Sequence, residues 1–211
     1  KKVILNTRVQ NTSNEVLMSP SKTNDDDKTF NFNYSNTCSK LEISGSDGSI
    51  YHWKHSLKWL MGNNERRIVK AKSKHLTLHT ETYILDQMKN VVAICRTKDI
   101  FSFTHTPFIW ILKEPKKLED IDIKEITKNP HDITVKGDFC KKRCIWYDSE
   151  GNIITKFNRD KSTCKSFYCV MGGNLNSELI LSVFIGLQKI LKDQRAINQT
   201  VVVNAGVTAI M

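Results

Sequence analysis

The sequence lacks any hydrophobic run long enough to cross a membrane. A membrane-spanning helix needs about 20 consecutive apolar residues, and no stretch of the chain approaches that length. The first apolar residues, Val3 to Leu5, are followed at once by polar ones, so no signal peptide is readable. We therefore expect an intracellular, cytoplasmic protein, with peripheral association as the remaining route to a membrane surface.

Motifs of catalysis and metal binding are also missing. None of the 6 histidines lies in a His-Glu-x-x-His pattern, and neither a Gly-x-Ser-x-Gly elbow nor a phosphate-binding loop is present. His75 and His79 stand four apart, a spacing that brings two ligands together on a helix but separates them on the strand expected here. The sequence predicts a protein that is not an enzyme and has no metal or cofactor.

Cysteine is sparse, with 6 in 211 residues, which excludes a small scaffold built from disulfides. We expect reduced thiols that pack as small apolar residues. The alternative is a zinc site made from two pairs, but the second pair, in Cys-Lys-Ser-Phe-Tyr-Cys, reads as extended chain and not as a tight metal-binding turn. Packing alone is expected for Cys38 and Cys95, and either role is open to Cys140, Cys144, Cys164 and Cys169.

The composition is that of a folded, basic protein. Hydrophobic residues make up 39% of the chain and charged residues 26%, which suits one substantial core. The 32 Lys and Arg against 22 Asp and Glu leave a net charge of +10. This balance favours a polyanionic partner, which is RNA, a ribosome or an anionic membrane.

The chain divides into three parts by composition and residue pattern. Residues 1–29 are rich in Asn, Ser and Thr, so we expect a loosely attached polar arm. From 30 to 193, short runs of β-branched and aromatic residues alternate with Gly, Asn and Asp, as in an all-β domain. Within it, residues 113–130 are charged and are expected to link two halves, and a strand or a short helical turn at the centre of this segment is left open. Residues 194–211 form an extension, either an added strand or a tail that docks on a protein partner.

Several hairpins are readable. Two share a template in which Asp86 is followed by Asn90, and Asp148 by Asn152, between β-branched runs. Such a recurrence indicates a pseudo-symmetric sheet, because Asp and Asn side chains bond to nearby backbone amides in turns. Another hairpin turns at Asp47-Gly48. Its alternation places Leu41 and Ile43 on one face of the first strand, and Tyr51 and Trp53 on one face of the second.

One segment, residues 177–192, has the pattern of a helix. Glu178 stands at its start and Lys189 and Lys192 at its end, as the helix dipole prefers. Its apolar residues cover nearly the whole circumference, so the helix must be surrounded by other parts of the protein. A closed β-barrel supplies apolar walls on every side, and the sequence therefore predicts a barrel around this helix.

In the order of these elements the chain resembles a known family. The resemblance rests on residues 96–110, the hairpin at 148–151, the Phe-Tyr-Cys-Val-Met run at 167–171, and the helix that follows. These are similar to the LURP-one-related branch of the tubby-like C-terminal domain superfamily, to which phospholipid scramblases also belong. The resemblance implies a mainly β fold, a closed antiparallel barrel of about twelve strands enclosing one central hydrophobic helix. It also implies that there is no known catalytic centre.

Two basic clusters are the candidate anion-binding residues. In the first, alternate lysines of an expected strand project from one face as a row of charges suited to phosphates. Lysines also protect sheet edges against aggregation, and this alternative stays open. The second cluster flanks the later hairpin. The residues are Arg66, Arg67, Lys70, Lys72 and Lys74 in the first cluster, and Lys141, Lys142 and Arg143 in the second.

The resemblance and the charge together suggest a function. Tubby relatives bind phosphoinositide headgroups through outward basic residues, so the resemblance implies an adaptor that binds phosphoinositide-containing membrane. The competing hypothesis is a factor associated with RNA or the ribosome, whose basic loops contact phosphates while its polar terminal extensions enter a groove. No small-molecule substrate is inferred in either case.

Overall fold

The structure is a computed structural model that describes residues 27–35, 37, 39–54, 59–74, 81–97, 107–139, 141–159, 165–172 and 176–208. For residues 74 and 194–208 it describes the backbone alone. The polar arm expected at residues 1–29 therefore lies almost entirely outside the described residues.

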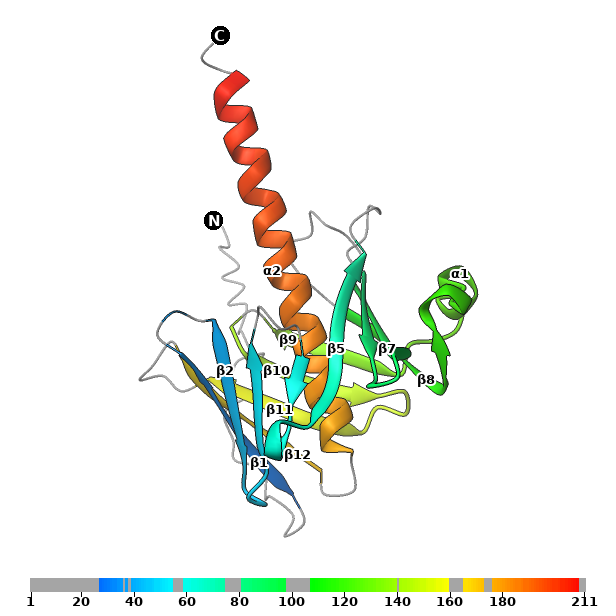
Figure 1. The fold of residues 1–211 in the computed structure, drawn as a ribbon, viewed down its shortest axis with the longest axis vertical. Helices are drawn as coiled ribbons and strands as arrows, with labels where there is room; N and C mark the ends of the chain where they lie inside the picture. Colours follow the sequence, from blue (N-terminus) through cyan, green and yellow to red (C-terminus); the bar gives the residue numbers. More distant parts are fainter. Residues whose placement is uncertain are drawn as a thin grey trace, which may run out of the picture.

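Twelve strands form a closed antiparallel barrel in which β1 pairs with both β2 and β12 (Figure 1). The predicted fold class is thus confirmed. The strands are β1 (Lys28–Tyr34), β2 (Lys40–Gly45), β3 (Ile50–Lys54), β4 (Trp59–Met61), β5 (Arg67–Lys74), β6 (Glu81–Leu85), β7 (Asn90–Thr97), β8 (Pro107–Lys117), β9 (Ile133–Asp138), β10 (Arg143–Asp148), β11 (Ile153–Arg159) and β12 (Ser166–Met171). The helices are η1 (Asn63–Glu65), η2 (Leu118–Asp120), α1 (Ile123–Ile126) and α2 (Ser177–Thr208).

The alternation of apolar and polar residues sets which face of each strand lies inside. In β2 and β3, Leu41 pairs with Trp53 and Ile43 with Tyr51 across the ladder. All four side chains are buried, as predicted, while their neighbours along β3 are exposed. The period of two in the sequence is therefore the period of the barrel wall.

The segment expected to be a linker, residues 113–130, has a different role. Strand β8 runs on to Lys117, and the chain beyond it folds back over the outside of β6 and β7. The strand and the helical turn left open for this segment are both present, but the segment is more than a linker, because the apolar residues scattered among its charges cover a second, outer cluster. That cluster is formed by Tyr83, Leu85, Val91 and Ile94, packed against Leu112, Leu118, Ile121, Ile123 and Ile126. Strand β6 is consequently buried on both faces.

The two hairpins with a shared template form the same turn. The amide of Asn90 donates to the Asp86 carboxylate at 2.8 Å, and Asp86 N donates to Asn90 O at 2.9 Å. Asn152 and Asp148 repeat both bonds at 2.8 and 3.0 Å. The turn at residues 45–49 has the same backbone bonds, from Gly45 N to Ser49 O and from Gly48 N to Gly45 O.

The fourth position of each turn is left-handed. It is occupied by Gly48 (φ 80°), Lys89 (φ 68°) and Gly151 (φ 88°). Glycine adopts this conformation without steric cost, whereas a lysine is strained there. The three turns thus share one backbone geometry with unequal conformational cost.

Helix α2 fills the barrel, as predicted. Its side chains are buried from Ile180 to Leu187, and Ser182 is enclosed with them. Phe184 stacks on Phe157 with ring centroids 5.1 Å apart. At Gly186 the helix approaches the wall closely, because a Cβ atom there would lie 2.5 Å from Ile84 Cδ1.

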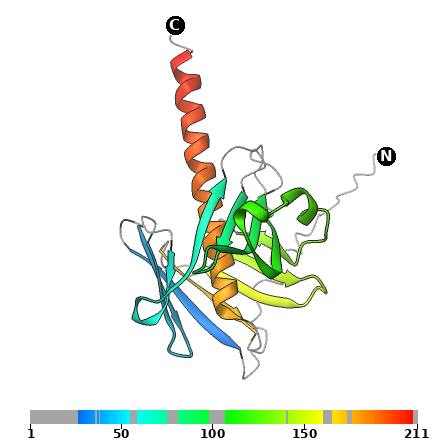
Figure 2. The ribbon, with the colours of Figure 1, turned by 45° about the vertical axis from the view of Figure 1, so that its right-hand side comes forward.

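The helix is longer than the sequence predicts. It was expected to end at residue 192, but its backbone continues to Thr208 and leaves the barrel at one end (Figure 2). The run Val201-Val202-Val203 favours a strand by local propensity. Once a helix is nucleated inside the barrel, however, each added residue gains one hydrogen bond at little further cost.

Because all neighbouring strands are antiparallel, their connections alternate between two ends of the barrel. We call the end that holds the turns at 45–49, 86–90 and 148–152 the turn end. The start of α2 also lies there, since Glu178 is paired with Arg66 just before β5. We call the other end the exit end, where Asp193 of α2 accepts a hydrogen bond from Ser73 near the end of β5 at 2.6 Å.

Candidate functional site

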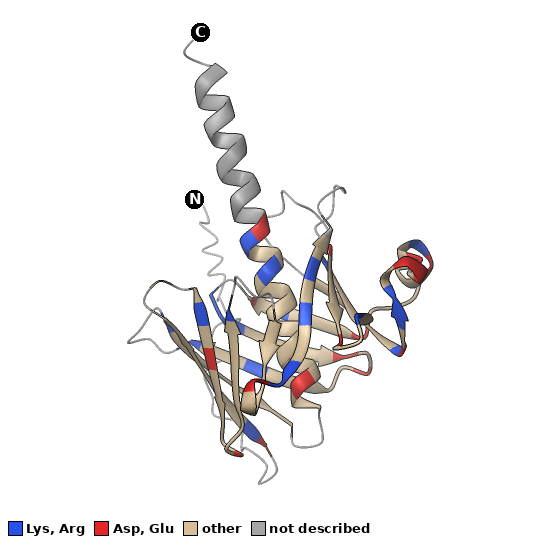
Figure 3. Cartoon of the chain, viewed as in Figure 1, with Lys and Arg blue, Asp and Glu red and all other residues tan. Residues whose placement is uncertain are grey.

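The exit end is rich in cations. They come from the ends of several strands and from α2 as it leaves the barrel, and Figure 3 shows blue positions along β5 and on α2. Most of these side chains are exposed. The residues are Lys40, Lys54, Lys72, Lys141, Arg143, Arg159, Lys165 and Lys192.

Most of the described carboxylates near this end already contact a cation. The ion pairs are Asp138–Lys141 at 3.1 Å, Asp193–Lys189 at 3.0 Å and Glu81–Arg96 at 3.6 Å. Glu42, on β2, is exposed. The excess of cations over carboxylates gives this end a positive potential, which attracts anions and raises their rate of encounter.

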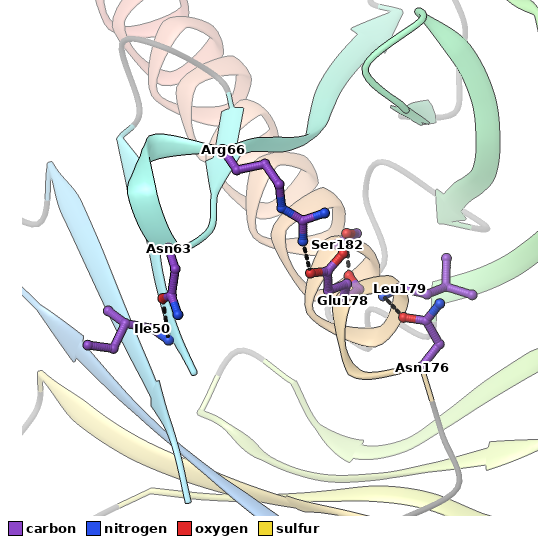
Figure 4. Close-up of polar contacts among 7 residues, drawn as sticks. All are labelled: Ile50, Asn63, Arg66, Asn176, Glu178, Leu179 and Ser182. Carbon is purple, nitrogen blue, oxygen red and sulfur yellow. Dashed lines mark hydrogen bonds and ion pairs between the residues drawn. The ribbon is translucent and has the colours of Figure 1, made fainter. Parts of the chain in front are cut away.

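The first predicted cluster is spread along β5. Arg66 stands just before the strand at the turn end, where its guanidinium pairs with Glu178 at the start of α2 (Figure 4). Lys72 lies farther along the strand and is exposed, and of Lys74 only the backbone is described. The cluster is therefore a line from one end of the barrel towards the other, and not one compact site.

The ring of Trp59, in β4, contacts two cations of this cluster. Its ring lies 5.6 Å from the Arg67 guanidinium carbon and 5.9 Å from Lys70 Nζ. Such cation–π contacts hold both charges against the outer wall. Protection of a free sheet edge, the alternative explanation for these lysines, does not apply, because β5 is paired on both sides, with β4 and β6.

The second predicted cluster contains one cation that points into the barrel. Lys142 Nζ lies 4.6 Å from the ring centroid of Phe139, 5.5 Å from that of Phe184 and 5.8 Å from that of Phe167. It also donates to the Phe139 carbonyl at 3.4 Å. Lys142 thus covers the aromatic core at the exit end. This role could not be predicted from the sequence, because the neighbours of Lys142 in the chain are also basic.

The other two members of the second cluster are at the surface. Lys141 pairs with Asp138, and Arg143 is exposed at the first position of β10. Strands β5 and β10 are separated by four strands in the barrel order. The structure therefore does not bring the two predicted clusters together, although Lys72 and Arg143 both belong to the exit end.

Sequence reasoning missed two lysines at this end, Lys40 and Lys54. They are direct partners across the β2–β3 ladder. The signal was present in the hairpin around Asp47-Gly48, because pairing Leu41 with Trp53 forces the next pair outward to be Lys40 with Lys54.

The described cysteines are packing residues, as predicted. Cys95, Cys144 and Cys169 are fully buried and form no disulfide bond, and burial raises the pKa of the Cys95 and Cys169 thiols well above the ordinary value. Cys38, Cys140 and Cys164 lie outside the described residues. Among the residues that the structure does describe, no group of three or more His, Cys, Asp or Glu is placed to hold a metal ion.

His131 is the described histidine with the clearest partners. Its ring meets Phe108 edge-on at 4.9 Å, and Nε2 lies 2.8 Å from the Thr134 hydroxyl. His75 and His79 lie outside the described residues.

In the described part of the chain, no helix is long and apolar enough to span a membrane.

Comparison with known proteins gives little. No family model matches the chain, and no curated protein matches it. Among solved structures, an X-ray structure of a protein from Arabidopsis thaliana is similar, with 13% sequence identity, a TM-score of 0.39, and 78% of this chain and 91% of that chain covered. A likeness this loose carries no argument about family or function.

Proposed function

We propose that this chain is a non-enzymatic, tubby-like barrel of the LURP-one-related type that binds anionic surfaces and acts as an adaptor. The preferred surface is a membrane that contains phosphoinositides. One observation carries the proposal: the exit end gathers exposed cations, while most of the described carboxylates near it already have a cation of their own. Cations at such an end attract an anionic surface without needing a deep cleft.

The course of α2 supports an adaptor role. The helix leaves the barrel at the same end and continues to Thr208. A protein partner that binds this part of the helix is thereby held beside the surface to which the barrel is attached.

Vesicle co-sedimentation at near-physiological salt tests the proposal. We expect the full chain to sediment with phosphatidylcholine vesicles that contain phosphatidylinositol 4,5-bisphosphate, and not with phosphatidylcholine alone. The triple substitution Lys72→Glu, Arg143→Glu and Lys192→Glu at the exit end is expected to weaken binding by about tenfold or more, since each reversal replaces an attraction by a repulsion.

The matched control reverses three exposed lysines at the end of β8 and in the segment that covers the outside of β6 and β7, Lys116→Glu, Lys117→Glu and Lys124→Glu. It changes the net charge equally and is expected to keep most of the binding. Equal losses in both variants, or no dependence on phosphoinositide, would contradict the proposal. Co-purification with ribosomal RNA that falls steeply with salt, in the absence of vesicle binding, would favour the RNA-associated alternative instead.

A further inference from the structure

A pocket of about 300 Å³ lies where β1, β2 and β3 reach the exit end. It is lined by residues 33–35 of the first strand and its end, 40–42 of the second and 52–54 of the third. This volume is at the lower limit of small-molecule sites and suits one headgroup, not a polymer.

Two lysines face each other directly at this pocket. Lys40 and Lys54 are partners across the antiparallel ladder, and both are exposed. Like charges in this position destabilise a sheet. Within the described residues neither lysine forms an ion pair, and both sides of their strands are already paired, so they do not protect an edge. An anion bound between them would relieve this repulsion.

The rest of the lining contains polar side chains, and one wall of the pocket is hydrogen-bonded to the central helix. Asn33 and His52 supply further polar groups, and Glu42 is the one carboxylate among the lining residues. Beneath them, the Tyr34 hydroxyl donates to Gln188 Oε1 of α2 at 3.1 Å. The wall of the pocket is therefore fixed to the central helix, which reduces the cost of ordering it around a ligand.

Hydrogen bonds within the connection shape its rim. Ser35 N donates to Lys40 O at 3.0 Å, and Lys40 N donates to the Ser35 hydroxyl at 3.1 Å. The backbone of Lys165 adjoins the same rim, because Tyr34 N donates to its carbonyl at 3.0 Å. The position of Lys40 is thus set by the backbone on both sides of the connection between β1 and β2.

We propose that this pocket binds a phosphorylated headgroup, with Lys40 and Lys54 holding the phosphate oxygens between them. The inference rests on the proposed function and deepens it, since it gives the anionic surface a specific point of attachment. The chemistry is that of a phosphomonoester, supplied either by a lipid in a membrane or by a free inositol phosphate.

Titration calorimetry with inositol 1,4,5-trisphosphate, together with the vesicle assay, tests the pocket. The variant is Lys40→Gln with Lys54→Gln, which removes both charges without removing apolar packing. The matched control is Lys124→Gln with Lys128→Gln, two exposed lysines of the segment that covers the outside of β6 and β7. We expect the pocket variant to lose affinity for the trisphosphate by about tenfold or more, because charge-assisted bonds to phosphate are lost. The control is expected to match the wild type.

The outcomes separate this inference from the proposed function. Vesicle binding that is unchanged in the pocket variant, with no trisphosphate affinity in the wild type, overturns the pocket and leaves the anionic surface in place. Trisphosphate binding that needs Lys40 and Lys54, without any vesicle binding, supports the pocket for a free ligand and overturns the membrane proposal. Equal losses in the pocket variant and the control overturn the pocket. Thermal unfolding of each variant shows that the fold is retained.

Discussion

The two ends of the barrel are built on different principles. At the turn end, carboxylates are used inside tight turns, where Asp86 and Asp148 accept backbone hydrogen bonds from Asn90 and Asn152. At the exit end, the aromatic core is covered by Lys142, and surrounding cations face outward. Charge therefore stabilises the chain locally at one end and is available to a partner at the other. A net charge of +10 says nothing of this division.

The largest loss of stability is expected for a substitution in the enclosed helix, because this helix contacts both ends of the barrel. Phe184→Ala removes a ring that is fully buried and stacked on Phe157 at 5.1 Å. We expect a loss of about 3–5 kcal/mol in the free energy of unfolding, because the cavity cannot close within a rigid barrel. Urea unfolding measures it, with Phe184→Leu as the milder control. A loss below about 1 kcal/mol would show that the helix is not tightly held.

Substitution of two adjacent lysines at the exit end tests whether one stabilises the core while the other is only a surface charge. Lys142→Ala is expected to cost about 1–2 kcal/mol, since it removes a cation that lies 4.6 Å from the Phe139 ring centroid. Lys141→Ala breaks only an exposed pair with Asp138 and is expected to cost less than about 0.5 kcal/mol. Denaturant midpoints of both variants decide, and equal values would mean that Lys142 is an ordinary surface cation.

The turns at the other end allow a reciprocal exchange. Lys89 (φ 68°) and Gly151 (φ 88°) occupy the same position in matching turns. Gly151→Ala is expected to destabilise by about 1 kcal/mol through backbone strain alone, because a Cβ atom there meets nothing within 4 Å. Lys89→Gly is expected to stabilise by up to about 1 kcal/mol. Thermal denaturation of both variants checks the signs, and the same sign in both would refute the shared geometry.

Acidification is expected to lower the stability of the protein slightly through a carboxylate at the turn end. Hydrogen bonds from the Ser49 hydroxyl and amide lower the pKa of Asp47 below its ordinary value. A carboxylate with a lowered pKa contributes stability above its unfolded pKa, about 3.9, and loses it as the pH falls through the folded value. Asp47→Asn is therefore expected to be less stable than the wild type at pH 6 and nearly equal to it at about pH 2. Urea midpoints between these values measure the difference, and a constant difference would rule out this linkage.

Much of the wall and of the enclosed helix could be predicted from the sequence, because both depend on local periodicity. Leu41, Ile43, Tyr51 and Trp53 alternate with polar residues, and a helix that is apolar on all sides can be satisfied only by enclosure. The covering segment after β8 was misread, since its isolated isoleucines among charges have no period of their own. The candidate site was predicted only in part. Charge along the chain does not reveal which cations have partners, as Lys142 shows.

The sequence by itself determined the alternating strands, the fully apolar helix that requires enclosure and the turns, because each is specified by residues close together in the chain. Only the tertiary structure decided how the charges are distributed. Strand register and the enclosed helix pair Arg66 with Glu178 and direct Lys142 onto Phe167 and Phe184. The physical reason is that an electrostatic interaction depends on distance in space and on burial, and a folded barrel sets both between residues that are far apart along the chain.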